Sequence, residues 1–242
     1  MWQRERTPEL TERQGAASVR AVALVLPGGS MNSRGRHLKI VEWGLRSLMA
    51  QIADQGAEDG IAVHLLRYRY RGWNGGEAHT AVDTQWALEE IQQRYGEVPV
   101  ALIGNSLGGR AAFWTAGHPS VVSVTGVAPW LPAGDATEQL AGRKVLIMHG
   151  DADRSQATPE QSLAYAERAR RITPDVCRFE VAGANHYLLN RAPDCWALAT
   201  DFVLATIGSR PLNPVIVQAM SVAAGLRMPL PVGFGRRMVA AG

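Results

Sequence analysis

The sequence predicts an α/β protein, a three-layer α/β/α sandwich built around a mostly parallel, doubly wound sheet. Short apolar runs alternate with longer segments of helical periodicity along most of the chain, and glycine-rich or polar turns separate them. A chain of 242 residues with 46% hydrophobic residues is long enough for one such core. We expect one folded domain over residues 19–207, a polar N-terminal arm over 1–18, and a basic extension containing Gly and Pro over 208–242.

Each element follows from its own residue pattern. The expected strands are short apolar or alternating runs: 20–26, 61–66, 98–103, 121–127, 145–148 and 176–181. The expected helices carry apolar residues three or four positions apart: 36–54, 80–95, a helix beginning near 110, 159–172 and 195–207. The stretch 128–142, between two expected strands, is too short for an inserted cap domain, so we expect an open site at the carboxyl ends of the strands.

The most specific motif is Gly104-Asn105-Ser106-Leu107-Gly108-Gly109, which lies between the strand 98–103 and the helix that begins near Arg110. On such a strand-turn-helix junction the serine has a strained backbone and its hydroxyl points outward at the end of the strand. Small residues must flank it, because a Cβ there would strike the neighbouring strand or helix. The motif therefore predicts a nucleophile elbow with Ser106 as the nucleophile.

A nucleophile elbow predicts an acid and then a histidine farther along the chain, each just after a strand. Asp151 and Asp153 lie on the turn after 145–148, and the spacing alone leaves both open as the acid. His186 lies on the loop after the last expected strand, so we expect it to be the general base. The other histidines fit surface, strand or turn positions better: His37, His64, His79, His118 and His149.

The elbow, the His149-Gly150-x-x-Asp153 run and the Gly183-x-x-His186 run resemble, in this order, the α/β-hydrolase superfamily over roughly residues 19–207. Further runs resemble its small, capless, dienelactone-hydrolase-like esterases of high-GC bacteria: 104–112, 128–132 and 149–151. In the family's His-Gly-x-x-Asp pattern the acid is the third residue after glycine, which favours Asp153 and leaves Asp151 to cap backbone amides.

The resemblance implies a serine hydrolase that cleaves a carboxylic ester or thioester through an acyl-enzyme intermediate, with Ser106, His186 and Asp153 as its triad. An acyltransferase or a cyclase would use the same triad. A ligand-binding protein of this fold without turnover is the alternative from another class. No cofactor is expected, and no metal, because His149 and Asp151 are too few ligands for a site.

Acyl transfer also needs N–H donors for the oxyanion. One is expected from the backbone of Leu107, at the start of the helix after the serine. The second is expected from the loop after the strand 20–26, where this chain has Pro27-Gly28 and the superfamily usually has His-Gly. Alignment to the family makes Gly29 the donor and Ser30 the alternative. A plain glycine turn without a role in the oxyanion hole is the structural alternative.

Loop residues near these positions are candidates for an apolar substrate pocket, although ordinary packing at loop ends also accounts for each: Ser30, Met31, Trp73, Trp130 and Tyr187. Arg67, Arg69 and Arg71 lie on one side of the continuing strand after residue 66. They would either bind a substrate carboxylate, as the dienelactone-like resemblance suggests, or tie loops together through groups such as Glu77 or Asp83. Of these two, we expect the second.

Composition excludes other classes. With 19% charged residues, a net charge of +3 and no zinc-finger or RNP-type pattern, the chain is not expected to bind nucleic acid. No run approaches the roughly 20 apolar residues of a membrane helix, and the polar start has no signal-peptide core, so we expect a cytoplasmic protein that acts on a small molecule. Cys177 and Cys195 have no metal-ligand spacing and are expected to be free buried thiols.

From residue 208 onward the chain has no Asp or Glu, and its arginines make the protein basic: Arg210, Arg227, Arg236 and Arg237. Asn213 as N-cap, Pro214 at the first helical position and Gly225 beyond the end predict a helix over 215–224. The apolar residues of this helix would pack on the body of the chain, on a second subunit in a homodimer, or on an anionic surface.

Overall fold

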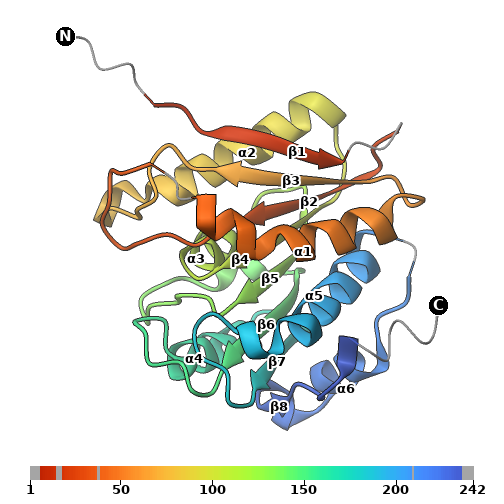
Figure 1. Cartoon of the computed structure of the whole chain (residues 1–242). Helices are drawn as coiled ribbons and strands as arrows, with labels where there is room; N and C mark the ends of the chain where they lie inside the picture. The colour runs from red at the N-terminus through yellow and green to blue at the C-terminus, as the bar shows by residue number, and fades with distance from the viewer. Residues whose placement is uncertain (1–5, 15–17, 37–38, 209, 236–242) are drawn as a thin grey trace.

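The computed structural model describes residues 6–14, 18–36, 39–208 and 210–235. In this part of the chain a twisted eight-stranded sheet lies between two layers of helices (Figure 1). The strand order is β1-β3-β2-β4-β5-β6-β7-β8, and every neighbouring pair is parallel except β1 with β3. The predicted three-layer sandwich with a mostly parallel, doubly wound sheet is confirmed.

The central strands follow the apolar runs of the sequence: β2 (Ala21–Leu26), β3 (Ile61–Arg67), β4 (Val100–Asn105), β5 (Val121–Val127), β6 (Lys144–Gly150) and β7 (Val176–Val181). The helices are α1 (Lys39–Gly56), α2 (His79–Tyr95), α3 (Leu107–Thr115), α4 (Pro159–Ala169), α5 (Ala192–Ile207) and α6 (Pro214–Ser221). Short 3-10 helices complete the elements: η1 (Gly75–Glu77), η2 (Glu138–Leu140), η3 (Leu189–Arg191) and η4 (Ala223–Leu226).

Two edge strands were not predicted, β1 (Glu9–Gln14) and β8 (Met228–Pro229). β1 runs antiparallel to β3, and the hydroxyl of Thr11 donates a hydrogen bond to the Leu65 carbonyl at 3.0 Å. Its sequence is mostly polar because an edge strand borders solvent, where charged residues prevent pairing with another chain. Part of the segment expected as a polar arm therefore extends the sheet.

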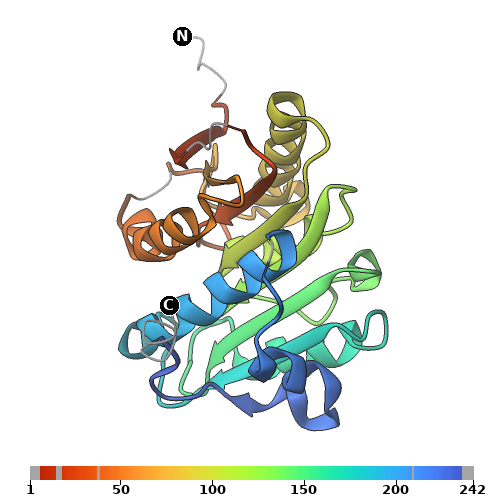
Figure 2. The same cartoon turned by 90° about the vertical axis from the view of Figure 1, so that its right-hand side faces the viewer.

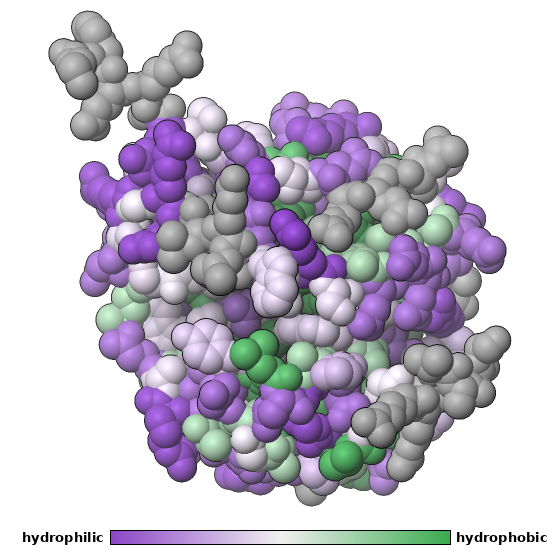
Figure 3. All heavy atoms as spheres, viewed as in Figure 1, coloured by the Kyte–Doolittle hydropathy of each residue, from purple (hydrophilic) through white to green (hydrophobic). Residues whose placement is uncertain are grey.

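Both faces of the sheet are buried, as the two helical layers require. Along β2, Ala21, Ala23 and Val25 pack with α1 and α5, whereas Val22 and Leu24 point to the other face, where α2, α3 and α4 pack. Figure 2 shows α1 and α5 on the opposite side of the sheet from α2. The surface in Figure 3 is mostly hydrophilic, with hydrophobic residues in small separate groups. No helix in the described ranges is long and apolar enough to span a membrane.

Residues 210–235 of the C-terminal extension pack against the body of the same chain, at the lower edge of Figure 1. Its helix α6 buries Ile216 and Ala219 completely in the core that α5 also lines. The N-cap is the predicted one, since the Asn213 side chain accepts the Val215 N–H at 3.0 Å. The helix ends at Ser221, three residues before the predicted end, and the chain continues as η4.

Arginines of the body hold the backbone of this extension. Arg178, which is fully buried, donates to the Leu226 carbonyl, and Arg191 donates to the Leu230 and Pro231 carbonyls. Arg170 donates to the Val222 and Ala223 carbonyls. The burial of Ile216 and Ala219 and these arginine contacts hold the extension on its own chain, and no finding supports the homodimer considered for this segment.

Candidate active site

Ser106 is the single residue between the end of β4 and the start of α3. Its backbone has φ 51° and ψ −115°, a conformation that residues other than glycine seldom adopt. Two hydrogen bonds to the segment 127–130 hold it: the Ser106 N–H donates to the Val127 carbonyl, and the Trp130 N–H donates to the Ser106 carbonyl, both at 3.0 Å. The surrounding backbone therefore fixes the strained turn.

Two glycines make the sharp turn sterically feasible. A Cβ on Gly108 would lie 2.2 Å from the Leu26 carbonyl oxygen of β2, and one on Gly104 would lie 2.3 Å from the Gly108 carbonyl oxygen. Both distances are far below a van der Waals contact, so neither position tolerates a side chain. This is the steric reason for the small residues of the motif.

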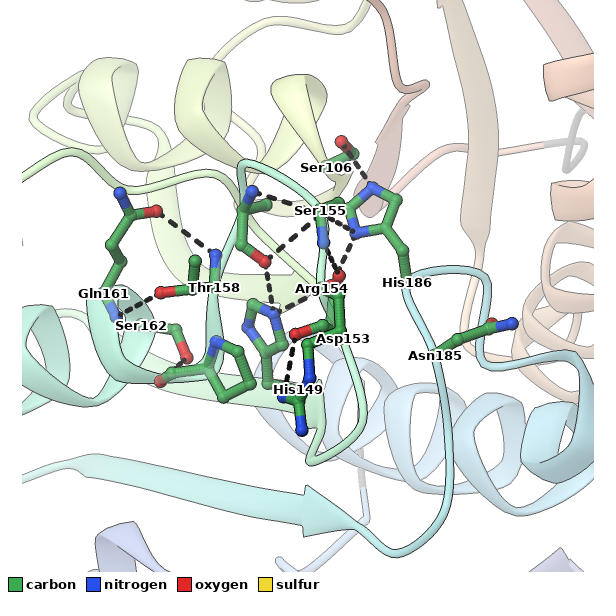
Figure 4. A network of polar contacts seen from close by, with 12 residues as sticks. Ser106, His149, Asp153, Arg154, Ser155, Thr158, Gln161, Ser162, Asn185 and His186 are labelled. Atoms are coloured by element: carbon green, nitrogen blue, oxygen red, sulfur yellow. Dashed lines mark hydrogen bonds and ion pairs between the residues drawn. The ribbon is translucent and has the colours of Figure 1, made fainter.

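The structure brings Ser106, His186 and Asp153 together at the carboxyl ends of β4, β7 and β6 (Figure 4). His186 Nε2 lies 2.9 Å from Ser106 Oγ, and His186 Nδ1 lies 2.7 Å from Asp153 Oδ2. A carboxylate only accepts, so Nδ1 carries a hydrogen and Nε2 is free to accept the serine hydroxyl proton. These groups have the relative geometry of a nucleophile, a general base and an acid that orients the base.

The Asp153 carboxylate is completely buried, and three kinds of donor surround it. Burial alone would raise its pKa, but hydrogen bonds from His149, from the Ser155 N–H and from His186 outweigh that effect and hold the pKa well below its usual range. The Ser155 N–H lies 2.8 Å from Oδ1. Asp153 is therefore an anion at neutral pH, able to stabilise a positive charge on His186.

Asp151, the other carboxylate on this turn, takes a different role. Its Oδ1 accepts the Gly183 N–H at 2.8 Å, and the side chain is exposed. It ties the turn after β6 to the turn after β7 and makes no contact with His186 among the hydrogen bonds of the described residues. The structure thus places Asp153, and not Asp151, beside His186.

Two backbone N–H groups beside Ser106 are free to bind an oxyanion. Within the described ranges, the N–H groups of Gly29 and Leu107 have no hydrogen-bond partner, and both residues line the same pocket as Ser106. The Ser30 N–H, by contrast, donates to the Arg71 carbonyl at 2.9 Å, as part of a bridge between residues 30 and 72. Of the two residues considered for the second donor, only Gly29 has an N–H without a hydrogen-bond partner among the described residues.

A pocket of about 350 Å³ opens next to Ser106 and His186. Its other lining residues are Gly29, Ser30, Met31, Leu107, Trp130, Ser155, Gln156 and Ala157. Ser30, Met31 and Trp130 were predicted here, and no charged side chain of the described residues other than His186, if protonated, lines it. The pocket is at the small end of the range for ligand sites and mixes apolar walls with hydroxyl and amide groups.

Trp73 and Tyr187 do not line this pocket, so the prediction for these two residues is corrected. The Trp73 indole is buried and packs edge-on against Trp114. The guanidinium carbon of Arg110 lies 3.9 Å from the centre of the Trp73 ring. Tyr187 follows His186 on the loop, but 70% of its surface is exposed and its ring points to solvent rather than to the cavity. In both cases a loop residue near the site turns its side chain away from it.

The three arginines at and after the end of β3 bind protein groups rather than the pocket. Arg67 pairs with Glu42 at 2.7 Å, and Arg71 donates to the Ser33 hydroxyl at 2.9 Å. Arg69 pairs with the buried Asp83, one of the two partners named from the sequence. The expected loop-tying role therefore describes them, and none of these three guanidinium groups lines the pocket.

Sequence reasoning missed four residues at the site. His149, at the end of β6, contacts Asp153, and Ser155, Gln156 and Ala157 form one side of the pocket. The signal available was their position on the turn that carries Asp153. Among the described residues no group of three or more His, Cys, Asp or Glu side chains could hold a metal ion.

No protein-family model and no curated protein matches the chain. Solved structures do match. A serine hydrolase homologue from Coxiella burnetii is 19% identical over 80% of this chain and 89% of its own, with a TM-score of 0.56. A serine hydrolase without a lid from Xanthomonas campestris is 16% identical over 84% and 90%, with a TM-score of 0.56. An esterase from Pyrococcus furiosus is 13% identical over 83% and 91%, with a TM-score of 0.60.

These likenesses concern the fold, because the identities are low. The segment of this chain between β5 and β6, where a lid would be inserted, holds only the 3-10 helix η2. The strand order, the elbow between β4 and α3, and the match to these structures agree. The chain therefore has the α/β-hydrolase fold, in a form without a cap domain between β5 and β6.

Proposed function

We propose that this protein is a serine hydrolase that cleaves carboxylic esters or thioesters through an acyl-enzyme intermediate. The observation that carries the proposal is the continuous hydrogen-bond chain from Ser106 through His186 to the buried Asp153, at 2.9 and 2.7 Å. The two unpartnered N–H groups of Gly29 and Leu107 beside the serine add the second element that acyl transfer needs. The names of the structural neighbours, hydrolases and an esterase, agree with this assignment.

In the proposed reaction each residue of the site has a defined step. Ser106 Oγ attacks the carbonyl carbon while His186 Nε2 takes the hydroxyl proton, and Asp153 stabilises the resulting imidazolium. The carbonyl oxygen, now negative, faces the N–H groups of Gly29 and Leu107. Collapse of this intermediate expels the alcohol or thiol, which receives the proton from His186. Water then attacks the acyl-serine with His186 as base, which releases the acid and restores Ser106.

The pocket indicates the kind of ester. Its walls are neutral, and its volume of about 350 Å³ suits a small acyl or alcohol group. Trp130, Met31 and Leu107 supply apolar surface, while the side chains of Ser155 and Gln156 supply polar contacts. We therefore assign uncharged esters or thioesters of modest size as substrates.

The test is labelling with a fluorophosphonate, which reacts with activated serines, followed by intact-mass measurement. We expect one adduct on the wild type, none on Ser106→Ala and strongly slowed labelling of His186→Ala. The matched controls are Ser221→Ala, an exposed serine on α6, and His118→Ala, whose ring binds Ser120 just before the amino end of β5, whereas Ser106 follows the carboxyl end of β4. Both should label as the wild type does. Steady-state hydrolysis of p-nitrophenyl acetate should fall by about 10⁴-fold or more in Ser106→Ala.

Two outcomes would overturn the proposal. A folded wild type that takes no label would lack an activated serine, and the protein would then be a ligand-binding member of the fold. Labelling that persists in Ser106→Ala would place the reactive group elsewhere. Product analysis in the presence of an added alcohol or amine then separates release of the free acid from transfer of the acyl group.

A further inference from the structure

His149 is a second histidine on the candidate catalytic acid. It lies at the end of β6, is completely buried, and points its ring at the turn that carries Asp153 (Figure 4). Its Nε2 atom is 3.2 Å from Asp153 Oδ2 and 2.9 Å from the Ala157 carbonyl oxygen. One ring nitrogen thus touches both the acid and a residue of the pocket wall.

The neighbours of this nitrogen determine which hydrogen it carries. Both are acceptors, a carboxylate oxygen and a carbonyl oxygen, so Nε2 must be the donor. The other nitrogen, Nδ1, is buried and has no hydrogen-bond partner in the described part of the chain. A hydrogen on Nδ1 would have no acceptor, so the contacts favour the ring with a single hydrogen, on Nε2.

Asp153 Oδ2 therefore receives two imidazole N–H groups, from His186 at 2.7 Å and from His149 at 3.2 Å, while Oδ1 receives the Ser155 N–H at 2.8 Å. Each donor withdraws charge from the carboxylate and limits its rotation. His149 extends from β6, a central strand between β5 and β7, and is itself paired with Glu180 of β7, so its ring is a rigid support.

We propose that His149 is a positioning residue for the candidate triad: its Nε2–H fixes the Asp153 carboxylate toward His186 and moderates the basicity of that carboxylate. This inference rests on the proposed function, in which Asp153 orients His186. The hydrogen bond to Ala157 connects the same ring to the pocket wall formed by residues 155–157.

Other ionisable and charged groups around this pair either bind other protein groups or lie exposed. Glu180, the register neighbour of His149 on β7, is bound by Arg178, and Asp151 binds the Gly183 N–H. Arg154 reaches the Asp153 carbonyl oxygen, and Glu160 lies exposed at the start of α4. None of these contacts the Asp153 carboxylate, so the two histidines and Ser155 determine its surroundings.

The variant that tests the proposal is His149→Phe, which keeps a flat ring of similar size and removes the donor. Asp153 would become a stronger base and would favour the protonated form of His186 more, so the acidic limb of kcat/KM should move to higher pH, by about half a unit or more. We expect kcat to fall about 10- to 100-fold, by analogy with the loss of a partner that orients a metal-ligating histidine. KM should change little. His149→Gln, which retains an N–H donor, should recover part of kcat.

His64→Phe is the matched control. His64 is also a completely buried histidine on a strand, β3. Its Nε2 atom lies 3.0 Å from the Tyr95 hydroxyl oxygen, and its Nδ1 atom has no hydrogen-bond partner among the described residues. Its substitution should cost stability without moving the pH limb. If His149→Phe left the limb where the wild type has it, or lowered kcat no more than His64→Phe does, the positioning role would be refuted.

Two NMR readouts require no turnover. In the wild type, the ¹⁵N–¹H correlation pattern of the His149 ring should be that of the Nε2–H form; an Nδ1–H form would overturn the proposal even if His149→Phe failed to fold. The His186 ring should titrate at higher pH in His149→Phe than in the wild type, and an unchanged midpoint in that variant would also overturn it. If the wild type takes no fluorophosphonate label, the hydrolase assignment is refuted. The titration of His186 still tests the role of His149 in that case.

Discussion

The guanidinium carbon of Arg110 lies 4.6 Å from the centre of the Trp130 indole, so the helix that begins after Ser106 supports one wall of the pocket. The same guanidinium lies 3.9 Å from the ring centre of Trp73, and it donates two hydrogen bonds of 2.7 Å to the carboxylate of Asp135. Stacking on aromatic faces and a bidentate carboxylate both fix a guanidinium in place. Arg110 therefore holds Trp130 from outside the pocket and contributes no free charge to it.

Replacing Arg110 with methionine should loosen this wall. We expect KM to rise several-fold for p-nitrophenyl esters with longer acyl chains and to change less for the acetate, because longer chains depend more on the position of Trp130. Stability should fall by about 3–5 kcal/mol, since the nearly buried Asp135 loses its partner. Kinetics over the ester series and urea unfolding measure the two effects.

The control for this substitution is Arg94→Met, which breaks the exposed Arg94–Glu90 pair on α2. It should change stability by no more than about 1 kcal/mol and leave chain-length preference unaltered. A loss of stability in Arg110→Met without any change in chain-length preference would mean that Arg110 supports the fold and not the pocket wall.

Substitution of Gly29 tests the candidate oxyanion hole. A Cβ on Gly29 would lie 2.1 Å from the Arg71 carbonyl oxygen and 2.8 Å from the Leu107 side chain, so Gly29→Ala must shift the loop that presents the N–H. We expect kcat to fall by about 10²–10³-fold, as for loss of one oxyanion donor. The measurement is kcat for p-nitrophenyl acetate, with circular dichroism to verify folding.

Gly76→Ala provides the comparison, because a Cβ there meets nothing within 4 Å. It should retain wild-type kcat and stability. Full activity of a folded Gly29→Ala would show that this amide does not bind the oxyanion.

The sequence predicted the central sheet well because each strand there is an apolar run between turns. β5 and β7 have the predicted ends, 121–127 and 176–181. β1 escaped prediction because pairing with the edge of β3 requires no apolar alternation on the solvent side, and the two-residue β8 is too short to leave a pattern. Such strands exist because a neighbouring strand offers hydrogen bonds, which is a property of the folded sheet.

In the candidate site, too, features set by local sequence could be predicted, and features set by packing in the folded chain could not. Ser106 lies in a local motif that leaves few conformations, and His186 and Asp153 follow strands whose ends meet at one edge of the sheet. The direction of a loop side chain is set by packing, which explains why Trp73 turned to Arg110 and Tyr187 to solvent. The contact of His149 with Asp153 could not be predicted, because it depends on how the turn after β6 folds back over the His149 ring.

Substrate charge should have a clear effect on turnover. The described lining of the pocket has no cationic group beyond His186, and Arg69 is paired with Asp83. A carboxylate in the substrate would lose water without gaining a partner. We expect kcat/KM for dimethyl succinate to exceed that for monomethyl succinate by about tenfold or more above pH 6. Comparable values for the two would indicate a cationic subsite. Arg69→Gln should leave the ratio unchanged.

The C-terminal extension should contribute to stability through α6. Ile216 is fully buried against the core, whereas its neighbour Val217 is 48% exposed. Ile216→Ala should lower the free energy of unfolding by about 2–5 kcal/mol, and Val217→Ala by no more than about 0.5 kcal/mol. Urea unfolding of the two variants gives the comparison. Equal, small effects would mean that α6 does not pack on the body in solution.

The stability of the fold should depend on pH through Asp153. Hydrogen bonds from His149, Ser155 and His186 overcome the effect of burial and lower its pKa in the folded state. A carboxyl whose pKa is lower in the folded than in the unfolded chain stabilises the fold at every pH above the unfolded value, about 3.9, and this contribution is lost as the pH falls toward the folded value.

Asp153→Asn removes the charge while keeping the shape, so it should reduce the free energy of unfolding more at pH 7 than at pH 3. Asp151→Asn, on the same turn but exposed, is the matched control and should have the smaller effect at pH 7. Urea unfolding of the three proteins at both pH values makes the measurement. If Asp153→Asn lowered the free energy of unfolding equally at pH 3 and pH 7, the three donors would not be stabilising an anion. The surroundings of Asp153 would then bind the protonated carboxyl group.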